Sequence, residues 1–219
     1  MKKNLNNATR TELVFLLDRS GSMSGLEADT IGGFNALIER QKKEAGECFL
    51  TTVLFDDSIE LLTDSTPLER VRPLTGREYF VRGNTALLDA VGLSIARTVE
   101  KQRTAPPHRK ADRVLFVITT DGMENASRKY RLTDIRRMIE HEKTRYGWEF
   151  IFLGANIDAI GTAAGFGISA DRAANYHADS AGTQLNFRVL SEAVAQVRSC
   201  APLSADWKRE IDEDYSSRS

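Results

Sequence analysis

The chain has 219 residues, of which 41% are hydrophobic and 28% are charged. This composition is typical of a globular domain with a sizeable core, and it excludes a largely disordered chain. Thirty basic residues nearly balance thirty-one acidic ones, so no global field attracts nucleic acid or an anionic membrane. We therefore expect a partner to be recognised at a local site, with neither nucleic acid nor membrane among the partners.

The amino-terminal residues have a basic start but no apolar stretch suited to a signal peptide. The first apolar run, Leu13 to Leu17, is too short for a signal core or a membrane span. We therefore expect a cytoplasmic protein. Cys48 and Cys200 are two thiols in a chain with a good core, and we expect both to be free rather than part of a disulfide scaffold.

Four segments have apolar residues in almost unbroken runs, which indicates strands buried on both faces of a parallel sheet. These segments are Leu13 to Leu17, Phe49 to Phe55, Val114 to Ile118 and Phe150 to Leu153. Stretches with one apolar face separate them and predict helices around Ile31 to Ile38, Leu88 to Ile95 and Ile135 to Ile139. A last amphipathic helix is expected from about Thr183 to Cys200. Strands alternate with helices along the chain, which favours an α/β fold.

Two further strands complete the expected sheet. Turn residues Asp56 to Ser58 join Phe55 to Ile59–Leu62 over too short a distance for a parallel crossover, so Ile59–Leu62 is expected as an antiparallel edge strand. A short candidate strand lies near Asn175 to His177. The sequence thus predicts a doubly wound, Rossmann-like, mostly parallel six-stranded sheet with helices on both faces. We expect an N-terminal extension over residues 1–10, one domain over 11–200, and a polar, partly disordered tail over 201–219.

Unusual polar residues follow the ends of the predicted strands. The first strand ends in Asp18, and Ser20 and Ser22 follow it in the pattern DxSxS, with Gly21 allowing a tight turn. Thr85 stands just before a predicted helix, and Asp121 follows the strand that ends near Ile118. In open parallel sheets, ligands bind beyond the carboxyl ends of the strands, where the strand order reverses. We therefore expect these side chains to form one site.

Two carboxylates and three hydroxyls make an all-oxygen set of modest negative charge. Such a set suits Mg²⁺ or Mn²⁺ better than zinc or copper. Magnesium usually keeps several waters, so an incomplete protein shell leaves positions open to an incoming ligand. The sequence therefore predicts a metal centre made of Asp18, Ser20, Ser22, Thr85 and Asp121.

At these five positions the chain resembles the von Willebrand factor A (vWA) domain family, whose metal-ion-dependent adhesion site (MIDAS) combines DxSxS with a distant Thr and a distant Asp. The resemblance in strand and helix order extends from about Thr11 to Cys200. It implies that Ser20, Ser22 and sometimes Thr85 bind the ion directly, while Asp18 and Asp121 act directly or through water. It also implies a binding module rather than an enzyme, with the Asp or Glu carboxylate of a partner protein completing the coordination.

Other interpretations of the same residues remain open. DRSGS, Thr85 and the Asp121–Gly122 pair are each also typical of turns and helix caps, and the motif could persist without using an ion. The alternative function is a Mg²⁺-dependent phosphohydrolase on a Rossmann-like sheet, with Asp18 as the nucleophile. Haloacid-dehalogenase-like phosphatases carry a second acid two residues after the nucleophile, and here that position is Ser20. A lysine poised at the site is also missing from the neighbouring loops.

Several residues near the expected site have more than one interpretation. Arg19, Met23 and Glu124 flank the expected ion and could tune the choice of partner. A basic stretch follows Asp121 and is either a solvated face or a partner-facing rim. Its members are Arg128, Lys129, Arg131, Arg136 and Arg137.

Overall fold

Six strands form one sheet in the order β3-β2-β1-β4-β5-β6 in the computed structural model, which describes residues 9–218. The strands are β1 (Arg10–Asp18), β2 (Glu47–Phe55), β3 (Ile59–Pro67), β4 (Arg113–Thr120), β5 (Glu149–Ala155) and β6 (Ala173–Tyr176). All neighbouring pairs are parallel except β2 and β3, which pair antiparallel. The expected fold class, with its antiparallel edge strand, is confirmed.

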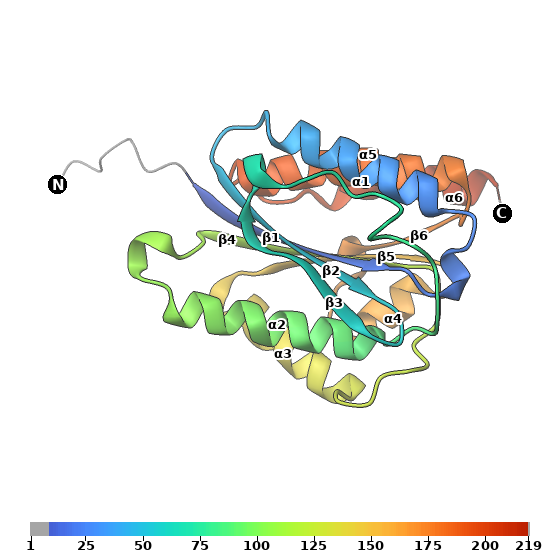
Figure 1. Cartoon of the computed structure of the whole chain (residues 1–219), viewed down its shortest axis with the longest axis horizontal. Coiled ribbons are helices and arrows are strands. Elements are labelled where there is room, and N and C mark those ends of the chain that lie inside the picture. Colours follow the sequence, from blue (N-terminus) through green and yellow to red (C-terminus); the bar gives the residue numbers. More distant parts are fainter. Residues whose placement is uncertain (1–8, 219) are drawn as a thin grey trace.

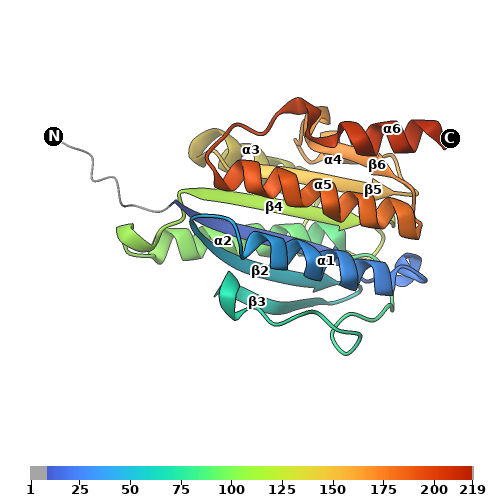
Figure 2. The same ribbon diagram turned by 90° about the horizontal axis from the view of Figure 1, so that it is seen from above.

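Helices cover both faces of this sheet, as Figure 1 shows. One face carries α1 (Glu27–Gln41), α5 (Ser180–Arg198) and α6 (Arg209–Ser217), and the other carries α2 (Leu87–Thr104), α3 (Leu132–Tyr146) and α4 (Ala159–Gly165). Seen from above, α1 and α5 run side by side across the sheet, with α6 beyond α5 (Figure 2). This arrangement buries both faces of the central strands, which explains why their sequences read as continuous apolar runs.

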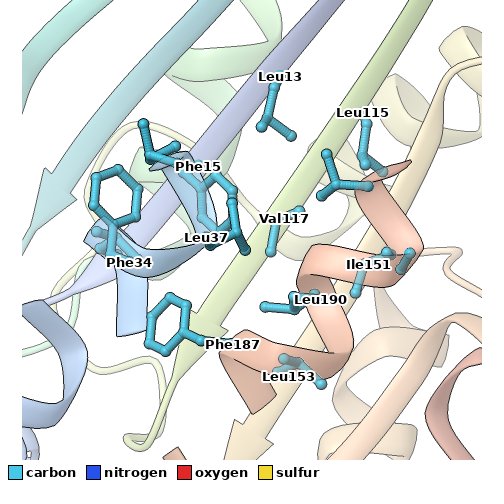
Figure 3. Packing of buried hydrophobic residues seen from close by; sticks show 14 of the residues in the cluster. Leu13, Phe15, Phe34, Leu37, Leu115, Val117, Ile151, Leu153, Phe187 and Leu190 are labelled. Carbon is cyan, nitrogen blue, oxygen red and sulfur yellow. The ribbon is translucent and has the colours of Figure 1, made fainter. Parts of the chain in front are cut away.

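Alternate side chains of each central strand enter two separate cores. Leu13, Phe15 and Leu17 of β1 belong to the core under α1 and α5, whereas Val14 and Leu16 belong to the core under α2 and α3. This division follows from the two-residue period of a strand. Figure 3 shows the first core, in which side chains of the strands meet those of α1 and α5.

The carboxyl-terminal segment packs onto the domain, so the expectation of a partly disordered tail is wrong. A 3₁₀ turn (Ala205–Lys208) and α6 follow α5, and Leu203, Trp207 and Ile211 are buried in the core shared with α5. These three apolar residues recur every fourth position, which fits one face of a helix, but the polarity of the rest of the segment favoured a disordered tail. Of the expected N-terminal extension, residues 1–8 lie outside the described residues, and Arg10 begins β1.

Two further features follow from the described residues. Cys48 is buried, Cys200 is exposed, and both thiols are free, as expected. Across residues 9–218, no helix combines the length and the hydrophobicity required to span a bilayer.

Gly33 sets how closely α1 approaches α5. A Cβ atom at Gly33 would lie 2.3 Å from Cδ2 of Phe187 on α5, whereas a Cβ atom at Gly32 would meet nothing within 4 Å. We expect Gly33→Ala to lower the free energy of unfolding by about 1–3 kcal/mol through overpacking. The matched control Gly32→Ala should raise it by up to about 1 kcal/mol, because alanine favours the helix.

Urea unfolding of both variants, followed by circular dichroism, measures this difference directly. Equal effects of the two substitutions would contradict the proposed close contact between α1 and α5.

Candidate metal centre

Pairing of β1 with β4 brings the two aspartates of the motif to one edge of the sheet. The strands are parallel neighbours, and Leu17 of β1 lies opposite Thr119 of β4. Asp18 ends β1, and Asp121 directly follows β4. The order of strands reverses between β1 and β4, so this edge is the switch point at which doubly wound sheets bind ligands.

A chain of hydroxyl groups connects the loops that meet at this edge. Thr85 Oγ1 donates to Ser20 Oγ over 2.9 Å, and Ser20 Oγ lies 3.2 Å from Ser22 Oγ. Ser22 Oγ donates to Asp121 Oδ1 over 2.5 Å, while Asp18 Oδ1 accepts from the Ser20 backbone N–H over 2.7 Å. The structure therefore brings all five sequence-predicted residues together.

Glycines allow the loops to approach this closely. The N–H of Gly21 donates to the carbonyl of Gly83 over 3.0 Å, so the DxSxS loop contacts the loop that leads to Thr85. Gly83 has a φ of +67°, and a Cβ atom there would lie 2.2 Å from Oδ2 of Asp57. A side chain at position 83 would therefore be strained and would displace the loop that carries Thr85.

Three residues that sequence reasoning did not place in the site hold it in shape. Thr120 Oγ1 donates to Asp18 Oδ2 over 2.5 Å, and the Tyr79 hydroxyl donates to the Asp18 carbonyl over 2.5 Å. Asn125 Oδ1 accepts from the Thr85 N–H over 2.9 Å. Adjacency to Asp121 could have indicated Thr120, but Tyr79 lies in a long loop whose course no local pattern reveals.

The side chain of Arg19 is buried beside the site and bonds to other parts of the protein. Its side chain has no exposed surface, and its Nε donates to Asp56 Oδ2 over 2.8 Å while Nη1 donates to the Glu78 carbonyl over 3.1 Å. Met23 is buried as well. Both side chains are covered by protein, so neither presents a surface to a partner, and an effect of Arg19 or Met23 on partner choice stays a prediction.

Glu124 also acts within the loop after Asp121. Its carboxylate accepts from the N–H groups of Ala126 and Ser127 and from the Leu88 N–H at the start of α2. These bonds tie the loop after β4 to the helix that follows Thr85. Glu124 thus orders the loop that directly follows Asp121.

The carboxylates of Asp18 and Asp121 are buried close together at the site. Burial and the nearby charge of Asp18 together raise the pKa of Asp121 to about 6, against the lowering effect of the Ser22 hydrogen bond. Burial also raises the pKa of Asp18, although hydrogen bonds from Ser20 and Thr120 oppose this effect. Asp121 Oδ2 is buried and has no hydrogen-bond partner among the described residues. Burying an acceptor without a donor costs free energy, and a bound cation would compensate this oxygen.

The space and the chemistry of the donor set fit a hard divalent ion. A Cβ atom at Gly122 would lie 2.8 Å from Ser22 Oγ and 2.9 Å from Thr85 Oγ1, so the glycine leaves room between the hydroxyls. Within residues 9–218, no group of three or more His, Cys, Asp or Glu side chains is placed to hold a metal. The cluster instead combines two carboxylates with three hydroxyls, a set typical of Mg²⁺ or Mn²⁺ rather than of a nitrogen or sulfur centre.

Solved structures with a similar fold include von Willebrand factor type A proteins. The chain is similar to proximal thread matrix protein 1 from the mussel byssus, with a TM-score of 0.56 and 12% identity over 87% of this chain and 46% of that one. It is also similar to a von Willebrand factor type A protein from Catenulispora acidiphila, with a TM-score of 0.55 and 16% identity over 86% and 43%. The ArnB paralog VWA2 from Sulfolobus acidocaldarius matches with a TM-score of 0.52 and 18% identity over 85% and 46%.

These likenesses establish the fold, which is that of a vWA domain. The chain spans less than half of the length of each of these three structures. No protein-family model matches the sequence, and no curated protein is significantly similar to it. The likeness therefore lies in the backbone arrangement, while the site rests on the residues of this chain.

Asp121→Asn removes the buried negative charge and nearly keeps the shape of the side chain. The variant therefore measures how much this charge lowers the free energy of unfolding. The folded pKa of about 6 exceeds the ordinary value of 3.8, so ionisation of Asp121 destabilises the metal-free protein as the pH rises through 6. We expect the variant, measured in chelator at pH 7.5, to be more stable than the wild type by on the order of 1–2 kcal/mol. The gain should shrink at pH 5, where Asp121 is largely protonated in the wild type.

Urea unfolding at the two pH values in the presence of chelator provides this measurement. A variant that is less stable than the wild type at pH 7.5 would show that the carboxylate is already balanced within the protein.

Proposed function

We propose that this protein is an interaction module that holds Mg²⁺ or Mn²⁺ at Asp18, Ser20, Ser22, Thr85 and Asp121, and that the ion binds an Asp or Glu side chain of a partner protein. The observation that carries the proposal is the buried, unpartnered Oδ2 of Asp121 beside three convergent hydroxyls. The vWA-domain fold of the chain is consistent with a protein-interaction module.

The protein residues have distinct roles in this proposal. Ser20, Ser22 and Thr85 supply neutral oxygens, and Asp18 and Asp121 balance the charge of the ion directly or through water. A bound divalent ion attracts a further anionic oxygen, since neutral hydroxyl ligands leave it electrophilic. Thr120 and Tyr79 keep Asp18 in place, and Asn125 positions the Thr85 backbone.

One solved relative supports metal binding at an equivalent motif. A second structure of proximal thread matrix protein 1 is described as having a zinc-occupied MIDAS motif, and it matches this chain with a TM-score of 0.54 and 12% identity over 88% of this chain and 47% of that one. For the present chain we propose magnesium or manganese instead, because its donor set is made of carboxylate and hydroxyl oxygens.

We propose a binding role rather than catalysis. Both oxygens of Asp18 accept hydrogen bonds, from the Ser20 N–H and from Thr120 Oγ1, which leaves this carboxylate poorly suited to attack a phosphoryl group. The position of a second catalytic acid is Ser20, as the sequence already indicated. We also propose a cytoplasmic location, where the free thiols Cys48 and Cys200 would remain reduced.

Titration calorimetry of the purified protein with Mg²⁺ and Mn²⁺ tests the metal site. We expect saturable binding in the wild type and a loss of at least about tenfold in affinity in Thr85→Ala, because a neutral ligand near the ion is removed. Thr104→Ala is the matched control, since Thr104 ends the same helix that Thr85 precedes and its hydroxyl bonds only to backbone carbonyls. Equal binding by both variants would contradict the assignment of Thr85.

Ser20→Asp should separate metal retention from carboxylate capture. The added charge should hold the ion more tightly but reduce its attraction for a partner carboxylate, because three acidic side chains then surround it. Calorimetry with Mn²⁺ reports the first effect, and Mn²⁺-dependent binding of a synthetic peptide with one central Asp reports the second. Ser24→Asp, an exposed position just beyond the motif, controls for the added charge. Parallel gains in metal and peptide affinity would argue against the proposed capture of a carboxylate.

A further inference from the structure

Two pairs among the five basic residues of the stretch after β4 differ in their surroundings. Arg136 and Arg137 lie on α3 and form ion pairs within that helix, with Glu140 over 2.8 Å and with Asp134 over 2.7 Å. These two cations therefore belong to a solvated, internally balanced helix face.

Arg128 and Lys129 behave differently. Both are exposed, and neither forms an ion pair within residues 9–218. They line a groove of about 620 Å³ together with Asp57, Ser58 and Ile59 at the turn between β2 and β3. The loop that carries them leaves the carboxyl edge of the sheet toward α3 in yellow-green in Figure 1.

This groove begins directly beside the candidate metal centre. Asn84 and Asn125 line it, and both lie next to Thr85. Asn84 precedes Thr85 in the chain, and Asn125 exchanges hydrogen bonds with the backbone of Thr85, at 2.9 Å and 3.1 Å. A chain segment whose carboxylate reached the metal centre would therefore have the groove as a neighbouring path.

The backbone beneath the two cations is held in place. Asp89 accepts from the N–H groups of Arg128, Lys129 and Tyr130, each over 2.9 Å. The cations thus project from an ordered loop, which lowers the entropy cost of contacting a ligand.

The two acidic groups that line the groove differ in exposure. Asp89 is buried and accepts from three backbone donors, whereas Asp57 is exposed and its Oδ1 accepts from Asn84 Nδ2 over 2.9 Å. Arg128 and Lys129 are exposed and form no ion pair in the described part of the chain, so both can contact an added carboxylate. Guanidinium and ammonium groups in this state select carboxylates, and Arg binds them in a bidentate manner.

We propose that this groove binds a second acidic residue, or a short acidic run, in the partner segment whose Asp or Glu reaches the metal centre. The inference rests on the proposed function and adds the character of the partner: an acidic protein segment rather than an isolated carboxylate. The two cations supply preference and faster association, and the metal supplies the anchor.

An array of synthetic nine-residue peptides tests this inference. Each peptide has one central Asp in a Gly/Ser background, with two Glu, two Lys or no added charge at each flanking position. The array is probed with the full chain in Mg²⁺ and in chelator. We expect Mg²⁺-dependent binding to be at least about fivefold stronger for peptides with Glu on one side, and this preference should weaken as salt is raised.

Charge reversal identifies the residues responsible. The double variant Arg128→Glu, Lys129→Glu should keep its Mg²⁺ affinity in calorimetry but shift its preference from Glu-flanked to Lys-flanked peptides. The matched control Arg136→Glu, Arg137→Glu changes cations of the same stretch that are paired on α3, and it should retain the wild-type preference.

The outcomes distinguish this inference from the function on which it rests. Mg²⁺-dependent binding with no preference for acidic flanks, or a preference that survives the charge reversal, overturns the inference alone. Absence of Mg²⁺-dependent binding to every peptide overturns the proposed function and the inference together. Stronger binding of a ten-nucleotide thymidine strand than of any peptide, lost on the same charge reversal, would assign the groove to nucleic acid and overturn the inference.

Discussion

The parallel pairing of β1 with β4 is the constraint on which the site depends. It places Thr120 next to Asp18, 102 residues apart in sequence, and it brings Asp121 within reach of Ser22. Residues of both cores hold these two strands at the centre of the sheet, so a burial pattern spread over the whole domain positions a few oxygen atoms at its edge. Loops bonded through Gly21 and Gly83 then add Thr85.

This arrangement is costly without a cation. Two carboxylates share a buried region, the pKa of Asp121 is raised to about 6, and one of its oxygens lacks a donor among the described residues. A fold under selection for stability alone would replace such a pair with hydrophobic or neutral side chains. The unfavourable electrostatics of the free protein and the affinity for a hard cation are thus two consequences of the same geometry.

The sequence predicted the parts of the structure that depend on regular patterns. Unbroken apolar runs indicated the strands, and the polar residues at their ends indicated the motif. It did not predict α6, because the polar residues around Trp207 and Ile211 favoured a tail, although the four-residue spacing of these two fits a helix. It also did not predict the role of Arg19, since only the folded chain shows that Asp56 and the Glu78 carbonyl bind its buried side chain. The sequence also did not distinguish Arg128 and Lys129 from Arg136 and Arg137. Only the structure shows that the second two form ion pairs on α3 and that the first two line a groove.

The most direct test of the account is a crystal structure of the protein grown with Mn²⁺, with data collected at the manganese absorption edge. The account requires an anomalous peak among Ser20, Ser22 and Thr85, close to the carboxylates of Asp18 and Asp121. Data that show no peak there at saturating Mn²⁺, with the five side chains hydrogen-bonded to one another as in the metal-free arrangement, would contradict it.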